Sequence, residues 1–266
     1  MAMRLPFTLL VAAAMLAACV TSGGPLATAP TQELRTASDQ TDADRRAAVR
    51  MELAALHFSS GQYSTALDEI KLALQARPDH GPAFSLRGLV YASMGEEALA
   101  DESFNRALQI NPRDADTLHN RAWFLCQRDK FVEAERLFEQ ALAVPQYRDT
   151  PRTFMAQGVC HARAGKLDEA ERKLTRAYEL DAGNPTTALN LAEVLYRQRA
   201  YERASFYIGR VNAASDAANA QTLWLALRIE NRMGNRGAVD EFGRQLRNRF
   251  PQSSETLAYE RGRLDD

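Results

Sequence analysis

Small and bulky apolar residues recur at helical spacing in residues 81–112, the stretch that carries the clearest pattern of the chain. Two small residues stand where a pair of antiparallel helices would cross closely, and three aromatic residues stand where side chains would fill the space beside that crossing. A proline then stops the second helix, because it lacks an N–H. In that order, these residues are Gly88 and Ala100, then Phe84, Tyr91 and Phe104, and finally Pro112. The stretch predicts a helix-turn-helix unit.

The same pattern returns along the chain, in units that begin near residues 47, 81, 115, 151, 185 and 220. Its spacing resembles that of the tetratricopeptide repeat (TPR), in which each unit of about 34 residues is a pair of helices. No long segment alternates apolar and polar residues as a strand would. We therefore predict an all-α fold, a TPR superhelical solenoid of about six helix-turn-helix repeats and about twelve helices, with a short capping helix over residues 254–264.

The amino-terminal residues read as an export signal. Residues 1–18 combine a short start carrying Arg4 with an apolar run that is shorter than the roughly 20 residues needed to span a bilayer. The run ends in Leu-Ala-Ala before Cys19, which resembles the lipobox of bacterial lipoproteins. That resemblance implies acylation of Cys19, and Val20 after it favours the outer membrane of a Gram-negative cell. The alternative is an ordinary secretory signal with an incidental cysteine.

These features divide the chain into three parts. We predict a lipoprotein signal peptide over residues 1–18, a lipidated Cys19 with a flexible spacer over residues 19–44, and the TPR domain over residues 45–266. The spacer is rich in Thr, Ser, Ala, Gly and Pro, which is typical of a flexible linker. Through Cys19 the membrane becomes an expected partner.

Composition and motifs argue against several functions. The 33 basic and 34 acidic residues nearly cancel, so no basic excess favours nucleic acid as a partner. The sequence contains no metalloprotease, hydrolase or phosphate-loop motif. Four scattered histidines are more consistent with packing or hydrogen bonding between helices than with catalysis: His57, His80, His119 and His161. We predict that the protein is not an enzyme and has no cofactor or metal site.

By resemblance to TPR proteins, the first helix of each repeat lines a concave surface. Repeats one to four place apolar residues there, which favours docking of an extended or helical peptide: Met51, Phe58, Leu89, Trp123, Met155 and Val159. Repeats four to six place cations there instead, with Tyr196 and Trp224 among them: Arg152, Arg163, Arg197, Arg228 and Arg232. The alternative is that some of the apolar residues, Phe58 and Trp123 especially, only pack against the neighbouring helix.

Two cysteines occupy consecutive first helices. Cys126 lies in the third repeat and Cys160 in the fourth, 34 residues later. Because sequential first helices of a solenoid stand side by side, the two sulfur atoms could face each other, and an exported protein would oxidise such a pair. Two buried free thiols are the alternative, since the bond requires Cα atoms within about 7 Å.

Several segments together resemble the PilF/PilW type IV pilus biogenesis and stability lipoproteins. They are the sequence LHNRAWFLC at residues 118–126, FEQA at 138–141, PQY at 145–147 and GVC at 158–160. The resemblance implies a pilotin, that is, an outer-membrane-anchored scaffold on the periplasmic face that binds the secretin subunit of the pilus machine and promotes its localisation and oligomerisation. We expect its soluble domain to be a monomer. The alternative is a TPR adaptor lipoprotein that regulates cell-wall or envelope proteins.

Overall fold

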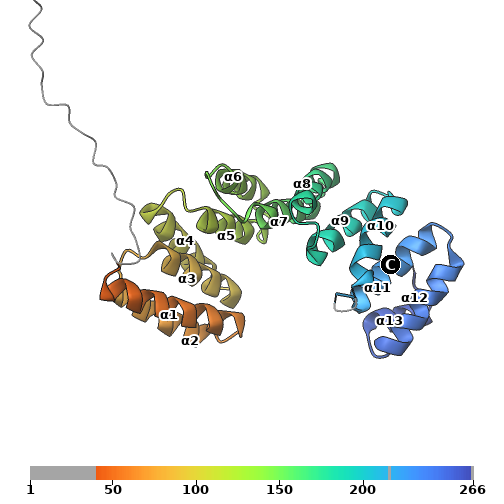
Figure 1. The fold of residues 1–266 in the computed structure, drawn as a ribbon, viewed down its shortest axis with the longest axis horizontal. Coiled ribbons are helices and arrows are strands. Elements are labelled where there is room, and N and C mark those ends of the chain that lie inside the picture. The colour runs from red at the N-terminus through yellow and green to blue at the C-terminus, as the bar shows by residue number, and fades with distance from the viewer. Residues whose placement is uncertain (1–39, 215–216, 265–266) are drawn as a thin grey trace, which may run out of the picture. The chain divides into compact units, whose positions relative to one another are not determined.

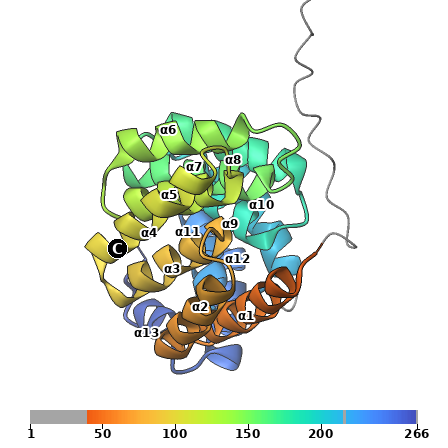
Figure 2. The same cartoon turned by 90° about the vertical axis from the view of Figure 1, so that its left-hand side faces the viewer.

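In a computed structural model of the chain, the described residues are 40–214 and 217–264. The chain divides into two units, Met1–Gln40 and Thr41–Asp266. The described part of the second unit is a superhelical TPR solenoid in which each helix pair packs against the pair before it (Figures 1 and 2). Its helices are α1 (Asp42–Ser59), α2 (Tyr63–Ala76), α3 (Gly81–Met94), α4 (Glu97–Ile110), α5 (Ala115–Cys126), α6 (Phe131–Leu142), α7 (Thr150–Arg163), α8 (Leu167–Leu180), α9 (Pro185–Arg197), α10 (Tyr201–Ala213), α11 (Ala220–Arg232), α12 (Arg236–Arg249) and α13 (Ser254–Glu260).

The first helix begins earlier than the predicted repeat start at residue 47 and the predicted domain start at residue 45. Thr41 caps α1: its hydroxyl accepts a hydrogen bond from the Asp44 backbone N–H, and the Asp44 carboxylate accepts one from the Thr41 N–H. This reciprocal capping box fixes the start of α1 at Asp42. The first turn is polar, so the apolar pattern could not reveal it. Residues 1–39, including Cys19 and the predicted signal peptide, lie outside the described residues.

Close helix crossings explain the small residues of the repeat. A Cβ atom added to Gly88 in α3 would lie 2.7 Å from the ring of Phe104 in α4, and one added to Gly158 in α7 would lie 2.6 Å from Leu174 in α8. Phe104 and Leu174 are themselves fully buried. The pairing of a small residue with a bulky one therefore sets the crossing of α3 with α4, as the spacing predicted, and of α7 with α8.

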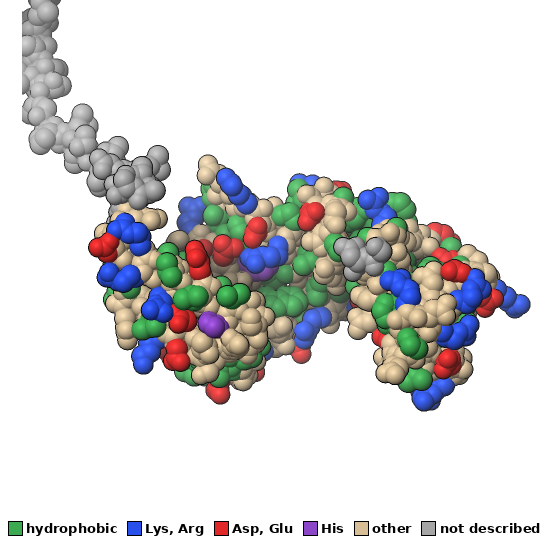
Figure 3. Space-filling model, turned by 60° about the horizontal axis from the view of Figure 1, so that its bottom comes forward, with side chains coloured by type: hydrophobic (Ala, Val, Ile, Leu, Met, Phe, Trp, Pro, Cys, Tyr) green, Lys and Arg blue, Asp and Glu red, His purple; other side chains and the backbone are tan. Residues whose placement is uncertain are grey.

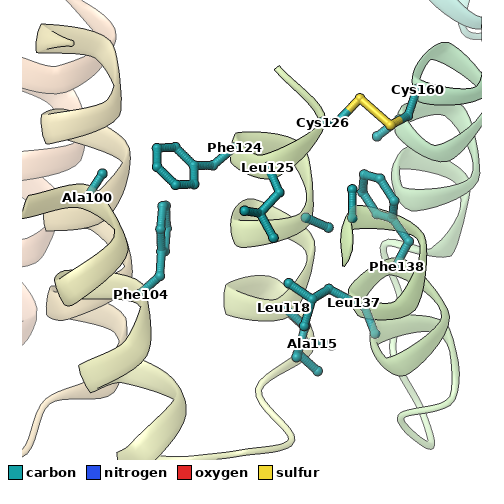
Figure 4. Close-up of a cluster of buried hydrophobic side chains, with 14 residues drawn as sticks. Ala100, Phe104, Ala115, Leu118, Phe124, Leu125, Cys126, Leu137, Phe138 and Cys160 are labelled. Atoms are coloured by element: carbon teal, nitrogen blue, oxygen red, sulfur yellow. A yellow bond between two sulfur atoms is a disulfide. The ribbon is translucent and has the colours of Figure 1, made fainter. Parts of the chain in front are cut away.

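The core continues from repeat to repeat, as Figure 4 shows for the central repeats. The rings of Phe104 in α4 and Phe124 in α5 lie 5.5 Å apart across one boundary. At the next boundary a disulfide joins Cys126 of α5 to Cys160 of α7, with their Cα atoms 5.8 Å apart. In the chain-entropy model such a cross-link contributes about 3 to 4 kcal/mol by restricting the unfolded chain.

The last repeat is covered by α13, which ends at Glu260 and is shorter than the predicted capping helix over residues 254–264. Gly243 in α12 makes room for this cover, because a Cβ atom there would overlap the Tyr259 ring of α13. Thr256 is buried, and its hydroxyl donates to the Phe250 carbonyl at 2.7 Å. The backbone turns at Gly262, whose φ is 68°, so the helix cannot continue to residue 264.

The described residues contain neither a membrane-spanning helix nor a cluster of metal-binding side chains. None of their helices combines the length and the apolar character that crossing a membrane requires. Within the same residues, no cluster of His, Cys, Asp and Glu side chains is arranged to hold a metal ion.

Candidate partner-binding surfaces

The six predicted apolar groove residues are all half-buried side chains. They lie on the first helices of repeats one to four: Met51 and Phe58 on α1, Leu89 on α3, Trp123 on α5, and Met155 and Val159 on α7. They divide among three core clusters, so each packs on one side against neighbouring helices. On the face that Figure 3 draws, charged side chains interrupt the hydrophobic ones. The six residues therefore belong to three separate core clusters.

A more exposed apolar surface lies on the outer side of α1, and the sequence reasoning missed it. Val49, Leu53 and Leu56 follow one another at intervals of four and three residues, so they share one helix face. Their side chains are 56%, 36% and 62% exposed, respectively. We call these three residues the α1 face.

Comparison with the other repeats shows why the α1 face is exposed. The residues that align with Val49 and Leu56 in the five later repeats are all at most 4% exposed, because the preceding repeat covers them. In chain order, they are Ala83 and Val90, Thr117 and Phe124, Thr153 and Cys160, Thr187 and Val194, and Thr222 and Ile229. Among the described residues no repeat precedes α1, so the face used between repeats stays open there. An alignment of the repeats would have revealed these positions from sequence.

Most of the predicted cations contact the preceding repeat. Arg152 forms an ion pair with Asp116 at 3.1 Å, and Arg163 one with Asp129 at 3.3 Å. Arg197, the last residue of α9, donates through Nη1 to the Ala162 carbonyl near the end of α7 at 3.0 Å. A cation at a helix carboxyl end stabilises the unpaired carbonyls there. These arginines therefore join consecutive repeats, and Arg232 stands at the equivalent place at the end of α11.

Arg228 differs from the other predicted cations. Its guanidinium lies 4.9 Å from the centre of the Tyr196 ring, and it makes no ion pair with any described residue. It lines a pocket of about 400 Å³ between α9, α11 and the start of α13, together with Arg197, Tyr196 and Trp224. Glu193 and Glu255 also line this pocket, and the sequence reasoning did not single them out.

The histidines make structural contacts. His119 is buried, and its Nδ1 lies 2.9 Å from the Thr153 hydroxyl of the next repeat, which also contacts the Tyr147 hydroxyl at 2.9 Å. Burial, with a smaller contribution from the nearby charge of Arg152, lowers the pKa of His119 to about 3. His119 is therefore neutral at ordinary pH.

The other three histidines also hold local structure. His57 contacts Gln62 at 2.6 Å, and the Nε2 of His161 lies 3.2 Å from the Glu135 carboxylate. His80 caps α3 by accepting from the Ala83 N–H at 3.3 Å.

Comparison with known proteins agrees with this architecture. Family models described as tetratricopeptide repeat match residues 82–114, 103–136, 120–185 and 161–226. Together they span four of the six helix pairs, α3/α4 to α9/α10, and reach into α11 of the last pair.

Individual relatives are more specific. The chain is 28% identical over 240 residues to the type IV pilus assembly protein PilF of Pseudomonas aeruginosa, which covers 90% of this chain and 91% of that protein. It is 27% identical over 135 residues to an uncharacterized protein of Haemophilus influenzae, which covers 51% of this chain and 75% of that one.

Solved structures give the same relationship. The crystal structure of PilW, a type IV pilus biogenesis factor, superimposes with a TM-score of 0.74 at 28% identity and covers 80% of this chain and 97% of that one. The structure of P. aeruginosa PilF superimposes with a TM-score of 0.71 at 24% identity, over 84% of this chain and all of that one. With the repeat models, the helix pairs and these relatives in agreement, the chain belongs to the PilF/PilW-like tetratricopeptide repeat proteins.

Proposed function

We propose that this protein is a scaffold of type IV pilus biogenesis that binds the secretin subunit of the pilus machine. In this proposal it acts as a pilotin on the periplasmic face of the outer membrane, held there by lipid on Cys19. The similarity to PilF and PilW over most of the chain supports a role in pilus biogenesis. The lipid anchor on Cys19 and the secretin as partner rest on the sequence resemblance.

The observation that carries partner binding is the exposed α1 face. Val49 and Leu56 occupy positions that are buried in every later repeat, so this face is already shaped to pack against helices. Covering exposed apolar area gives about 25 cal/mol per Å², which favours a partner that brings an apolar helix or hairpin. The predicted groove is a separate surface, because at about 3.6 residues per turn the half-buried Met51 and Phe58 lie on roughly the opposite side of α1. We expect a secretin segment to dock on the α1 face.

The proposed mechanism is tethering rather than chemistry. Two or more acyl chains hold a protein firmly on a membrane. A secretin subunit captured by such a tethered scaffold has a higher effective concentration at the membrane, without any new contact between subunits. Oligomerisation would then be favoured because the captured subunits are confined to one surface.

Co-purification of the secretin from membranes tests this proposal. We expect the double variant Val49→Glu/Leu56→Glu to recover secretin about tenfold less than the native protein, since charges would be buried in the contact. Both side chains are more than half exposed, so the variant should keep its fold. The matched control is Val132→Glu, because Val132 on α6 is 83% exposed. Equal recovery from all three proteins would overturn the α1 assignment, and recovery of cell-wall enzymes in place of secretin would favour the adaptor function.

A further inference from the structure

The pocket between α9, α11 and α13 contains four charged side chains that form no ion pair with any described residue. Two arginines and two glutamates line it, so its ionisable side chains balance. Arg197 uses one N–H on the Ala162 carbonyl, while Arg228 makes no ion pair with a described residue. Neither Glu193 nor Glu255 forms an ion pair within the part of the chain that the structure describes; Glu255 accepts only from the Ser254 hydroxyl, at 3.0 Å. Opposite charges therefore share one pocket without neutralising each other.

Arg228 is the side chain that most needs a ligand. It is half-buried, and its Nε is buried without a hydrogen-bond partner among the described residues. A carboxylate in the pocket could accept from the Nη groups of this guanidinium and so pair a charge that no described carboxylate pairs. The Tyr196 ring supports the guanidinium from one side, which orients it.

Apolar surface completes the pocket. Trp224 and the side chains of Leu189 and Leu225 line it beside the charges. Its volume of about 400 Å³ lies within the range of pockets that bind small ligands or a few side chains. Because α9 and α11 are the first helices of their repeats, the pocket lies on the series of helices that binds extended peptides in repeat proteins.

We propose that this pocket binds a segment of a partner protein in which an acidic and a basic residue flank a large apolar one. The acidic side chain accepts from Arg228, the basic side chain meets Glu193 or Glu255, and the apolar side chain packs on Trp224. A ligand with only carboxylates would be repelled by the two glutamates, and a purely apolar ligand would leave Arg228 unpaired. The site is separate from the α1 face, so it goes beyond secretin docking there.

The two tryptophans of the chain make the test direct. The substitution Trp123→Phe leaves Trp224, inside the pocket, as the only fluorescent tryptophan. Its emission is followed while acetylated and amidated peptides are added, so that terminal charges do not contribute. The probes are glycine-flanked aspartate-leucine-lysine and its reverse order, versions with asparagine or glutamine replacing the charged residues, and free leucine as a small zwitterion.

We expect one order of the doubly charged peptide to bind about tenfold more tightly than the peptides that lack either charge. Arg228→Gln should weaken that binding by about tenfold. Arg210→Gln is the matched control and should not change it, since Arg210 also lies over a tyrosine, Tyr178, at 5.9 Å but belongs to α10. Equal binding of charged and neutral peptides, equal binding by the Arg228→Gln protein, or equally tight binding of free leucine would overturn the proposal.

Discussion

At the carboxyl end of the repeats, α13 packs on α11 and α12, and Ile229 of α11 is fully buried. At the amino end, Leu56 of α1 aligns with Ile229 but is 62% exposed. The two residues hold the same place in their repeats, but a repeat precedes Ile229 and none precedes Leu56 among the described residues. The comparison teaches that a repeat position is not intrinsically core or surface, because its neighbour decides. At the other end of the repeats, α13 packs on α11 and α12, whereas the α1 face stays exposed.

The largest expected difference between the two positions appears when Ile229 and Leu56 are each replaced with alanine. Ile229→Ala should lower the free energy of unfolding by about 2 to 5 kcal/mol, because it removes fully buried methylene groups and leaves a cavity. Leu56→Ala should change it by no more than about 0.5 kcal/mol. Denaturant unfolding of the described unit with its native disulfide measures both. Similar losses would mean that α1 is covered in the folded protein.

The disulfide lies between the two ends, where it joins the third repeat to the fourth and should stabilise the whole domain. Replacing both Cys126 and Cys160 with serine should cost about 3 to 4 kcal/mol, because the unfolded chain regains the freedom of a loop of about 34 residues. Reduction of the native protein should have a comparable effect on the thermal midpoint, and reduction of the serine variant should have none. A stability unaffected by reductant would contradict the cross-link.

The buried His119 makes the centre of the solenoid sensitive to pH. Its folded pKa of about 3 lies below its ordinary value of 6.5, so the unfolded state binds the proton more readily between these values. Stability contributed by neutral His119 is present above about pH 6.5 and falls as the pH drops through that window. Between pH 7 and pH 5 the loss should be about 2 kcal/mol. In the His119→Gln variant, the loss in free energy of unfolding between pH 7 and pH 5 should be smaller by this amount, whatever the stability of the variant at pH 7. An unchanged slope would contradict the burial argument.

The smallest expected effect on stability comes from the open end. Leu56→Lys should leave the thermal midpoint of the isolated protein nearly unchanged, because the site is exposed. The same substitution should weaken partner capture, because it buries a charge in the contact. Loss of stability without loss of capture would reverse the comparison of the two ends.

Much of the fold followed from sequence for a local reason. The sizes and spacing of Gly88 and Phe104 predict their contact. The same pattern, repeated about every 34 residues, predicts the other helix pairs. The predicted start of the domain at residue 45 is later than the start of α1 at Asp42. The reason is that Thr41 and Asp44 fix this start through hydrogen bonds, which an apolar pattern does not reveal. The predicted capping helix extended to residue 264, but α13 ends at Glu260 because the backbone turns at Gly262.

The candidate sites were harder to predict because they depend on contacts between repeats. Arg163 reads as a free groove cation until Asp129 of the preceding repeat is placed beside it. Val49 and Leu56 read as ordinary repeat positions until the missing neighbour is noticed. The pocket around Arg228 includes Glu255 from α13, which no repeat alignment would contain.

Site-specific photocrosslinking tests directly whether the secretin docks on the α1 face. A photoreactive amino acid is placed at Leu53, in the middle of the α1 face, and in a second protein at the highly exposed Val132. Both proteins are irradiated in cells that assemble pili, and the crosslinked products are identified by mass. The account predicts a product with the secretin from position 53 and none from position 132. No secretin product from position 53, or equal products from both positions, would contradict it.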